Sequence, residues 1–537
     1  MLFNRVNGKC QFSLIIVYLL LGILLLKYYQ YAIGYSDGVS YISISHKYVS
    51  GDFSNAINGC WSPLFSWLLV PFLVIGLPTH IAVKVLSLII GLLTLLGIRR
   101  LSYAFDMRNS VRVIVLFSMI PIILWCALVA VTPDLLVVCI LVYYLSIIFS
   151  SDYSEKMSQG ILCGVLGGLA YLSKSYAFYF FASHFLLFNF LHYLNSSSLR
   201  RNILRNLVCG FVVFFIISSV WIGLISHKYG KLTLSTAVGY NNYLVGPEST
   251  PDPIKFPPWT RPTPCRQGLL EPPNETAVSS WEDPSYFVLK SWSPLDSAAS
   301  FKHQLKLIYT NVDQLINLYI LFSPIAPVII VAYLIFCLNS LNHLRLAKDN
   351  RLYPLLTLVL FPVGYLLLHV IHRYVWVNWV LLMLMGGHCV EVLLQGEFFG
   401  KYKKIVLVFF ALSFAAYPMY SLLKNINIGK DIYDQSKILH EQYNIEGRIA
   451  SNTSWVNSMY LSYYLNSKYY GVPQDGISEA ELETQLKKNN IDYYFVWGSD
   501  IELPCFLSNS KEKTDGQMHG LKIYSLKKAS VRQPKHR

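Results

Sequence analysis

A few charged side chains in this sequence stand at the ends of long apolar runs, where helix formation alone does not require them. Asp37 follows the first apolar run in "YSDGVSY", and Asp134 opens another in "VTPDLL". Lys174 separates two apolar runs in "YLSKSYAF", and Arg373 follows His372 in "IHRYVWVNW". A carboxylate can take a proton as a general base, and a fixed cation can stabilise negative charge as it develops. If the fold brings these residues together, they form a site lined by cations and at least two carboxylates.

Each of these residues also has a purely structural explanation. Asp37 before Gly38 is an ordinary turn or cap pair, and Asp134 can cap the helix that it opens. Lys174 can extend to lipid headgroups, although a charge in a tight turn between apolar runs is more often functional. The residues 372–373 can anchor a membrane boundary beside aromatic neighbours.

The composition places the chain in a membrane. Among its 537 residues, 54% are hydrophobic and only 14% are charged, whereas a soluble protein carries about 25% charged residues. The net charge of +14 would suit nucleic acid. In a membrane protein it reflects Lys and Arg retained in cytoplasmic loops, so we expect no nucleic-acid partner.

Spans of about 20 apolar residues are needed to cross the hydrocarbon core. Ten runs are clear candidates: 11–31, 79–98, 112–131, 134–150, 176–194, 207–226, 315–338, 353–371, 375–395 and 404–423. Two shorter runs, 62–77 and 158–173, are ambiguous by length. The second contains Gly160, Gly164 and Gly168, a spacing typical of close helix packing in lipid.

Basic residues decide between the two short runs. If 158–173 crosses and 62–77 lies along the interface, sixteen basic residues fall on one side of the membrane. They are Arg5, Lys9, Arg99, Arg100, Arg108, Arg112, Lys156, Arg200, Arg201, Arg205, Arg345, Lys348, Arg351, Lys401, Lys403 and Lys404. This excess marks the cytoplasmic side. We therefore predict eleven spans, a cytoplasmic N-terminus and an external C-terminus.

The predicted fold class is an all-α polytopic membrane domain with interfacial helices in its first external loop, followed by a small α/β domain. Residues 1–425 form the transmembrane domain, with external loops 32–78 and 227–314. Residues 426–537 form the external domain, in which short β-type runs alternate with helical ones. In this topology the candidate site residues all fall at the external face, namely Asp37, Asp134, Lys174, His372 and Arg373. Lys84 begins the second span at the same face.

The candidate residues belong to an ordered series of short motifs. It runs D-x-x-x-Y from Asp37 to Tyr41, "GDF", "SPLFSWLL", "TPD", "LSKSY" and a late "RY". This series resembles the integral-membrane glycosyltransferases of the C-type (GT-C) fold. The likeness is greatest to the branch of aminoarabinose transferases acting on lipid A and protein O-mannosyltransferases, and it covers roughly residues 10–425.

The resemblance implies roles for the site residues. Asp37 takes the place of the catalytic aspartate, the general base, and Tyr41 that of its partner. Lys174 and Arg373 correspond to positions that hold the donor's phosphate, and Asp134 to a second acid near the site. Lys84 and His372 are candidate assistants in binding that phosphate.

Two departures from the family pattern concern metal and sugar. Gly38 stands where many members have a second acid, and "HRYVWV" lacks the acid before "RY" and the proline after it. The sequence therefore does not determine which sugar is transferred, and it leaves open whether a divalent metal ion is a cofactor.

By resemblance, the donor is a sugar linked through phosphate to a polyprenyl chain, and the acceptor is a hydroxyl of a glycolipid, glycan or protein. The resemblance also implies inversion at the anomeric carbon, a multi-pass plasma (inner) membrane location, and a part in envelope glycan or lipopolysaccharide modification. Alternatives are a transporter or flippase for a lipid-linked saccharide, a polysaccharide ligase or polymerase, and a non-catalytic assembly protein.

Overall fold

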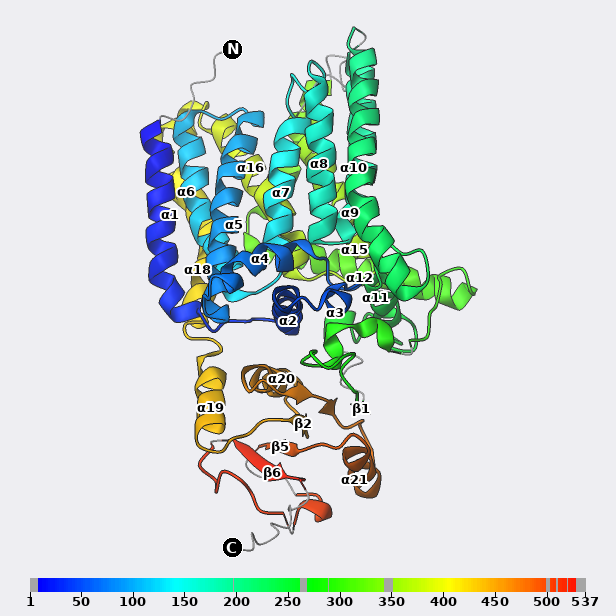
Figure 1. Ribbon diagram of the computed structural model, residues 1–537. Coiled ribbons are helices and arrows are strands. Elements are labelled where there is room, and N and C mark those ends of the chain that lie inside the picture. The colour runs from blue at the N-terminus through cyan, green and yellow to red at the C-terminus, as the bar shows by residue number, and fades with distance from the viewer. Residues whose placement is uncertain are drawn as a thin grey trace, which may run out of the picture.

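The computed structural model describes residues 8–196, 198–260, 268–287, 289–341, 351–498, 503–508, 510–518 and 520–527. Of the basic residues used above for orientation, Arg5, Arg345 and Lys348 lie outside these ranges. Figure 1 shows a bundle of long helices with a small strand-containing unit at one end. We call residues 430–527, as far as described, the C-terminal unit.

The bundle consists of apolar helices, most of them long. They are α1 (Gly8–Tyr29), α5 (Thr79–Leu101), α6 (Asn109–Val129), α7 (Asp134–Ile148), α8 (Met157–Ser173), α9 (Tyr176–Asn195), α10 (Arg200–Tyr229), α13 (Ala326–Leu341), α14 (Leu352–Leu360), α15 (Val363–Leu366), α16 (Trp376–Leu393) and α18 (Lys403–Lys424). Within the described ranges, 7 helices are long and apolar enough to cross a membrane, or up to 8 if a bent pair is one span. The shorter apolar helices Asp134–Ile148, Met157–Ser173 and Leu352–Leu366 coincide with three further predicted spans.

The run 315–338, predicted as one span, is divided between two helices. Helix α12 (Ala298–Phe322) starts far earlier and is bent by 101° against the helix that begins at Ala326. Ser323, which precedes Pro324, has the extended angles φ −153 and ψ 124. Proline disfavours helical angles in the residue before it and lacks an N–H, which explains the break.

The run 62–77 forms α4 (Leu64–Val74), a helix of 11 residues. At 1.5 Å per residue it is about 16 Å long, too short to cross the hydrocarbon core. It lies with α2 (Ser36–Ser50) and α3 (Phe53–Ala56) at the end of the bundle that faces the C-terminal unit (Figure 1). The interfacial position predicted for this run agrees with its length and place.

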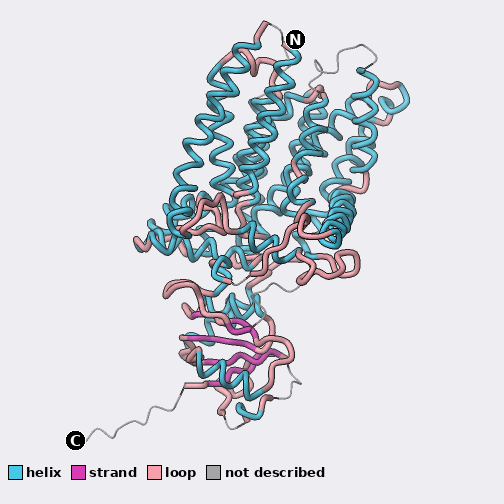
Figure 2. Tube along the Cα trace, turned by 90° about the vertical axis from the view of Figure 1, so that its right-hand side faces the viewer, coloured by secondary structure: helices cyan, strands magenta, loops and turns pink. Residues whose placement is uncertain are grey.

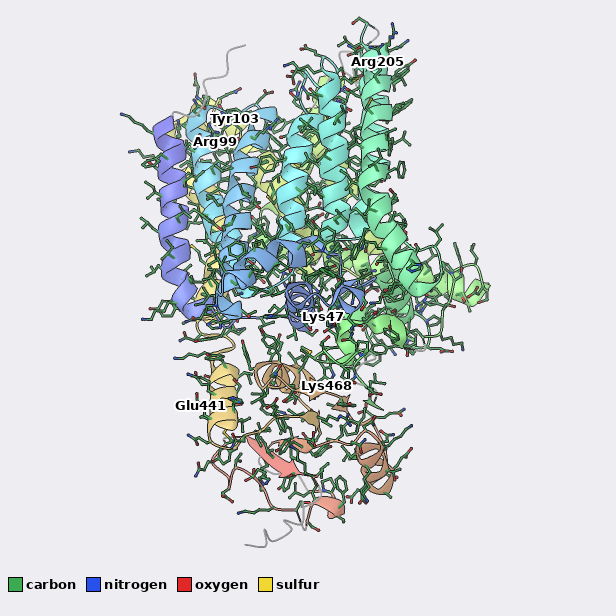
Figure 3. All side chains as sticks on the ribbon, in the orientation of Figure 1. Lys47, Arg99, Tyr103, Arg205, Glu441 and Lys468 are labelled. Atoms are coloured by element: carbon green, nitrogen blue, oxygen red, sulfur yellow. The ribbon has the colours of Figure 1, made fainter. Side chains whose placement is uncertain are left out.

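The two ends of the bundle differ in their basic residues. Arg99 and Arg205, both assigned to the cytoplasmic side, lie at the end remote from the C-terminal unit (Figure 3). Lys47 lies at the opposite end, toward Lys468 of the C-terminal unit. The arrangement therefore puts these two predicted cytoplasmic arginines at one end.

The glycines of α8 allow a close helix contact, as their spacing predicts. A Cβ atom on Gly164 would lie 2.2 Å from the carbonyl oxygen of Gly210, and one on Gly160 would lie 2.4 Å from that of Asn206. These distances leave no room for a side chain, so α8 and α10 pack backbone against backbone.

The C-terminal unit contains a four-stranded mixed sheet of order β3-β2-β5-β6. Strand β2 (Arg448–Ser451) pairs in parallel with β3 (Lys468–Tyr469) and β5 (Tyr493–Trp497), whereas β6 (Leu521–Ser525) is antiparallel to β5. Helices α20 (Trp455–Tyr464) and α21 (Glu479–Lys488) make the crossovers that parallel strands need. Figure 2 shows this unit beyond one end of the bundle.

The C-terminal unit is joined to the bundle by aromatic packing and by a strand pair. Tyr433 in α19 (Lys430–Glu441) stacks on Tyr31, with ring centroids 4.0 Å apart. Strand β1 (Gly268–Leu269), from the large loop, pairs antiparallel with β4 (Gly471–Val472). Both contacts lie at the end of the bundle where the candidate residues were predicted to gather.

Candidate active site

Asp37 is held in the first turn of α2, where an acid suits the positive end of the helix dipole. The next residue, Gly38, packs against the segment before α7. A Cβ atom there would lie 2.7 Å from Cγ2 of Ile33 and 3.1 Å from the carbonyl oxygen of Val131. This close packing explains why position 38 has no room for the second acidic side chain that many C-type glycosyltransferases carry there.

Four of the predicted residues meet in a chain of alternating charge. Nη2 of Arg373 lies 2.6 Å from Oδ2 of Asp37, and Nη1 lies 3.2 Å from Oδ2 of Asp134. Nζ of Lys174 lies 2.5 Å from the other oxygen of Asp134. The residues come from α2, the start of α7, the α8–α9 turn and the short helix η7 (His372–Val375). The predicted juxtaposition of these four charges is observed.

Burial differs along this chain, and Lys174 at one end is its most exposed member. The Asp134 and Arg373 side chains are 3% and 9% exposed, whereas those of Asp37 and Lys174 are 11% and 20% exposed. Burial lowers the pKa of Lys174 below its ordinary value, although Asp134 opposes this shift. Nε of Arg373 is buried without a hydrogen-bond partner among the described residues. The cations therefore retain donors for an incoming anion.

Aromatic side chains enclose the charges. Nε1 of Trp281, in η4 (Ser280–Glu282) of the large loop, donates a hydrogen bond to Oδ1 of Asp37 (3.3 Å). Cζ of Arg373 lies 4.7 Å from the ring centroid of Tyr35, and Nζ of Lys174 lies 3.7 Å from that of Tyr374. Cation–π contacts of this kind stabilise partly desolvated cations.

The structure places the remaining predicted residues around this network. Tyr41 is buried, and its ring packs edge-on against Trp61 and Phe65. Burial, with Asp37 nearby, raises the pKa of the Tyr41 hydroxyl well above its ordinary value. Nε2 of His372 lies 2.6 Å from the hydroxyl of Tyr35.

Lys84 occupies a different environment from the other predicted cations. It is 1% exposed, and its Nζ donates to the backbone carbonyl of Leu128 at 2.6 Å. The residues described show no ion pair between Lys84 and either site acid. Its place in the fold therefore does not link it directly to the charge network.

Three site residues were missed from the sequence. Tyr35 and Tyr374 stand within two positions of predicted site residues, so their neighbourhood was the available signal. Trp281 had no such signal, because it is 244 positions from the carboxylate that it contacts. Only the folded large loop brings its indole to Asp37.

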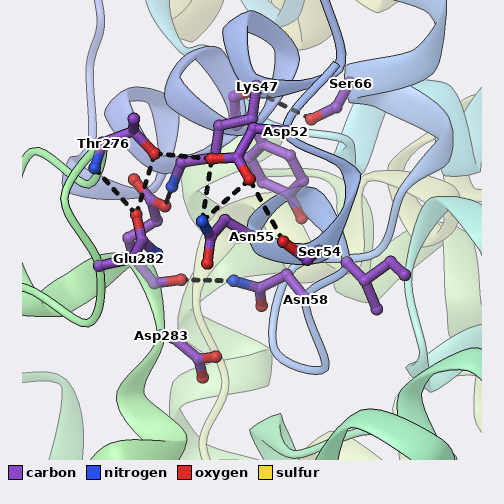
Figure 4. Close-up of polar contacts among 12 residues, drawn as sticks. Lys47, Asp52, Ser54, Asn55, Asn58, Ser66, Thr276, Glu282 and Asp283 are labelled. Carbon is purple, nitrogen blue, oxygen red and sulfur yellow. Dashed lines mark hydrogen bonds and ion pairs between the residues drawn. The ribbon is translucent and has the colours of Figure 1, made fainter. Parts of the chain in front are cut away.

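A second polar cluster holds the large loop against α2 (Figure 4). The side chains of Lys47 and Glu282 form an ion pair in which they are 2% and 3% exposed. Nδ2 of Asn58 donates to the carbonyl oxygen of Glu282 (2.7 Å), and Oγ1 of Thr276 donates to Asp52 (3.1 Å). Because Glu282 directly follows Trp281, this cluster fixes the segment that contacts Asp37.

The described residues do not favour a metal site. Among them no three His, Cys, Asp or Glu side chains are grouped so as to hold an ion. The two site acids face Arg373 and Lys174 instead.

Comparison with known proteins gives one family match. Residues 61–222 match the sequence family described as dolichyl-phosphate-mannose-protein mannosyltransferase. No curated protein sequence matches the chain. The matched residues include Asp134 and Lys174 of the charge network.

Solved structures extend the likeness to the whole fold. ArnT from Cupriavidus metallidurans in the apo state has a TM-score of 0.56 and 13% identity, covering 95% of this chain and 97% of that chain. Its structure bound to undecaprenyl phosphate has a TM-score of 0.52 and 14% identity over the same shares. The apo oligosaccharyltransferase of Archaeoglobus fulgidus has a TM-score of 0.56 and 12% identity, covering 91% of this chain and 70% of that chain.

The chain has the C-type glycosyltransferase fold. The resemblance and the fold class predicted from the motifs are thereby confirmed, including the small C-terminal mixed sheet. The predicted enzyme class, a membrane glycosyltransferase, agrees with the matched family and with these structures.

Proposed function

We propose that this chain transfers a sugar from a polyprenyl-phosphate-linked donor to an acceptor hydroxyl, with inversion at the anomeric carbon. The observation that carries the proposal is the chain of alternating charge from Asp37 through Arg373 and Asp134 to Lys174. It lies at one end of a bundle whose helices suit a bilayer, so a lipid tail can stay in the membrane while its phosphate reaches the cations. The undecaprenyl phosphate held by the similarly folded ArnT agrees with such a donor.

The cations bind the phosphate and stabilise the charge that develops on it. As the bond between the anomeric carbon and the phosphate oxygen breaks, its electron pair stays on the phosphate, and polyprenyl phosphate leaves with more negative charge. Nε of Arg373 and the free donors of Lys174 can hold those oxygens. Fixed donors of this kind stabilise a transition state without reorganisation.

Asp37 acts as the general base. The acceptor oxygen forms its bond to the anomeric carbon opposite the phosphate, and its proton passes to the Asp37 carboxylate. A carboxylate has about four lone-pair sites, and Asp37 uses two of them for Arg373 and Trp281. Phosphate binding draws Arg373 toward the donor, which leaves Asp37 free to accept the proton.

We also propose that the acceptor is a hydroxyl group of a glycolipid, a glycan or a protein. It approaches from the side of α2 and the C-terminal unit, where Asp37 is the more exposed acid. We also place the protein in the plasma (inner) membrane, with its C-terminal unit outside the cytoplasm. The basic residues that lie at the remote end of the bundle support this orientation.

Transfer from synthetic polyprenyl-phosphoryl sugars by protein purified in lipid nanodiscs tests the proposal. Asp37→Asn should lower kcat by about 10²–10⁴-fold, the usual contribution of a general base. Asp313→Asn is the matched control, because Asp313 is exposed in α12 and its carboxylate accepts from Asn317, away from the charge network. Near-normal turnover by Asp37→Asn would remove the base assignment.

The rival functions give other outcomes in the same preparation. Movement of the lipid-linked sugar across the bilayer without transfer would identify a flippase. A product carrying a whole glycan chain would identify a ligase or polymerase. Either result replaces the proposal.

A further inference from the structure

Helix α12 makes nearly a right angle with the helix that follows it, since its axis is bent by 101° from that of α13. In α13, Ile329 lies against Gly386 of α16. One turn further, the ring centroid of Tyr333 lies 5.6 Å from that of His388 in α16. Helix α13 therefore runs alongside α16, which is long and apolar enough to cross a membrane. It follows that α12 lies close to the membrane plane.

The depth of α12 is given by its last residue. The ring of Phe322 stacks on that of Trp379, with centroids 4.4 Å apart. Trp379 is in the first turn of α16, at the end where η7 carries Arg373. Figure 1 shows α12 at the same end of the bundle, toward the C-terminal unit. The helix therefore lies at the level where this span leaves the membrane.

One side of α12 packs against the protein. Its buried residues recur at helical spacing, as in Leu307, Asn311, Leu315, Leu318 and Phe322. Nδ2 of Asn311 donates to the backbone carbonyls at 366 and 368, both at 2.9 Å. Nε2 of Gln304 donates to the carbonyl at 367 at 3.1 Å. These bonds hold α12 on the end of α15 and fix which of its sides faces outward.

A second side of α12 is apolar and exposed. Its side chains are between 37% and 68% exposed, and they are Phe301, Leu305, Tyr309, Val312, Ile316 and Ile320. At 3.6 residues per turn they occupy an arc of about 100°. An apolar arc of that width is what an amphipathic helix normally buries. This face therefore requires an apolar cover along most of the helix.

A third side of α12 is polar. Lys302, Asp313 and Asn317 are exposed there, with Lys306 half-buried beside them. Nδ2 of Asn317 donates to Oδ2 of Asp313 at 3.1 Å. By helical spacing Lys302 lies at the border between the apolar and polar sides. Long basic side chains at such a border extend their charge toward lipid headgroups while the apolar face stays in the acyl region.

Lipid is the cover that fits these three sides. Helix α13 has exposed apolar side chains of its own, among them Val328 and Val331, at 66% and 56%. Since α13 runs along a membrane-crossing helix, these side chains face acyl chains. The bilayer therefore begins within a few residues of the point where α12 ends. A soluble partner would have to cover the apolar arc at this same level, where lipid is already present.

We infer that α12 lies in the bilayer interface at this end of the bundle. Its apolar side is among the acyl chains, and Lys302 and Lys306 lie at the anionic headgroups. The same helix holds the carbonyls of 366–368, which lead to Arg373, so it fixes that segment at the depth of the interface. The inference uses only geometry, exposure and charge, and it does not rest on sugar transfer.

Photo-crosslinking in nanodiscs of phosphatidylcholine and phosphatidylglycerol tests this position. Encoded benzoylphenylalanine takes the place of Leu305, Ile316 or Asn317, one at a time, and lipid adducts are quantified by mass spectrometry of the intact chain. Leu305 and Ile316 should each give at least about 5-fold more lipid adduct than Asn317, because only the apolar side enters the acyl region. Val331 in α13 is the positive control.

Other outcomes of this experiment would overturn the inference. Equal lipid yields at Leu305, Ile316 and Asn317 would mean that the apolar side does not face the bilayer. Crosslinks from Leu305 or Ile316 to a second copy would identify a self-association surface instead. Crosslinks to another part of the same chain would show that protein covers the face.

Two lysine variants test the headgroup contact. Lys302→Gln and Lys306→Gln, with the photo-reactive residue at Leu305, should each lower the preference of the adducts for phosphatidylglycerol by about 5-fold, as for one basic residue near an anionic surface. Lys487→Gln, in α21 of the C-terminal unit, is the matched control. A preference unchanged in both lysine variants would refute the headgroup contact. Sugar transfer is not a readout here, so failure of the proposed function would leave these results standing.

Discussion

Removing the charge of Glu282 should release the loop that carries Trp281. The Glu282 carboxylate is paired with Lys47 in α2, and both side chains are almost fully buried. The peptide that they fix also places the Trp281 indole against Asp37. Glu282→Gln preserves the size of the side chain but leaves the Lys47 cation without its ionic partner.

The expected effect follows from the burial of the pair. Loss of one partner of a buried ion pair costs about 3–5 kcal/mol, because the other charge is left uncompensated. The side chains are 2% and 3% exposed, so solvent screening does not reduce this value much. Since about 1.4 kcal/mol is a factor of ten, opening of the loop should become about 10²–10⁴-fold more frequent.

The effect should also depend on pH. Burial lowers the pKa of Lys47 to about 7, with Asp52 and Asp283 opposing the shift. Loss of the Glu282 carboxylate lowers this pKa further, so between pH 7 and the ordinary lysine value of 10.5 the open loop of the variant binds more protons than the closed one. Stability of the closed loop in Glu282→Gln should therefore rise with pH across this window.

Hydrogen–deuterium exchange of a peptide covering residues 277–287 measures this opening directly. Asp52→Asn is the control, since Asp52 links the same two segments through an exposed hydrogen bond to Thr276. It should change exchange less than 10-fold. The double variant Lys47→Met with Glu282→Leu should recover most of the loss, because apolar replacements of both partners remove the buried charges. If the 277–287 peptide of Glu282→Gln exchanged at the same rate as that of the wild-type protein, the reasoning would be refuted.

Three further predictions concern other parts of the chain. Because burial lowers the pKa of Lys174, kcat/KM for the donor should fall with rising pH before the ordinary lysine pKa is reached. Lys174→Arg should remove this decline at alkaline pH, because arginine stays charged. A decline that is unchanged in Lys174→Arg would exclude Lys174 as its source. Gly164→Val should destabilise the α8–α10 contact by at least about 1–3 kcal/mol in thermal unfolding, whereas Gly223→Ala, where a Cβ meets nothing within 4 Å, should have little effect. Burial alone would raise the pKa of Glu512, but hydrogen bonds from Thr514, Gly516 and Ile523 outweigh it and lower the pKa. The C-terminal unit should accordingly lose stability as the pH falls from 4.5 through that lowered value, and Glu512→Gln should lack this loss in acid-unfolding curves.

Hydrophobic run length and strand-type patterning predicted most of the fold. The tail illustrates this, since its predicted alternation of β-type and helical runs agrees with elements such as the strand Tyr493–Trp497 and the helix Glu479–Lys488. The bend after Phe322 was missed, because the apolar run continues through Pro324 and hydropathy does not register a missing N–H. Helix Lys430–Glu441 was also missed, since its polar composition carries little apolar signal.

The charged part of the site could be predicted because ionised groups are conspicuous among apolar spans. Asp37, Asp134, Lys174 and Arg373 meet as the topology predicts. The aromatic part could not, because a tryptophan in a proline-rich loop carries no positional signal and its partner is set by tertiary folding. Lys84 shows the opposite failure, since it was predicted to assist at the site but its Nζ donates to the backbone carbonyl of Leu128 instead.

The pairing of β1 with β4 has a practical consequence for anyone who produces the tail as a separate fragment. Residues 430–527 expressed alone would lack the partner supplied by Gly268 and Leu269, leaving an open backbone edge at Gly471–Val472. They would also uncover the ring of Trp455, which meets Trp281 in the intact chain. An unpaired strand edge and an exposed tryptophan ring both promote self-association. Antigens or crystallisation fragments should therefore be tethered to the 268–287 segment.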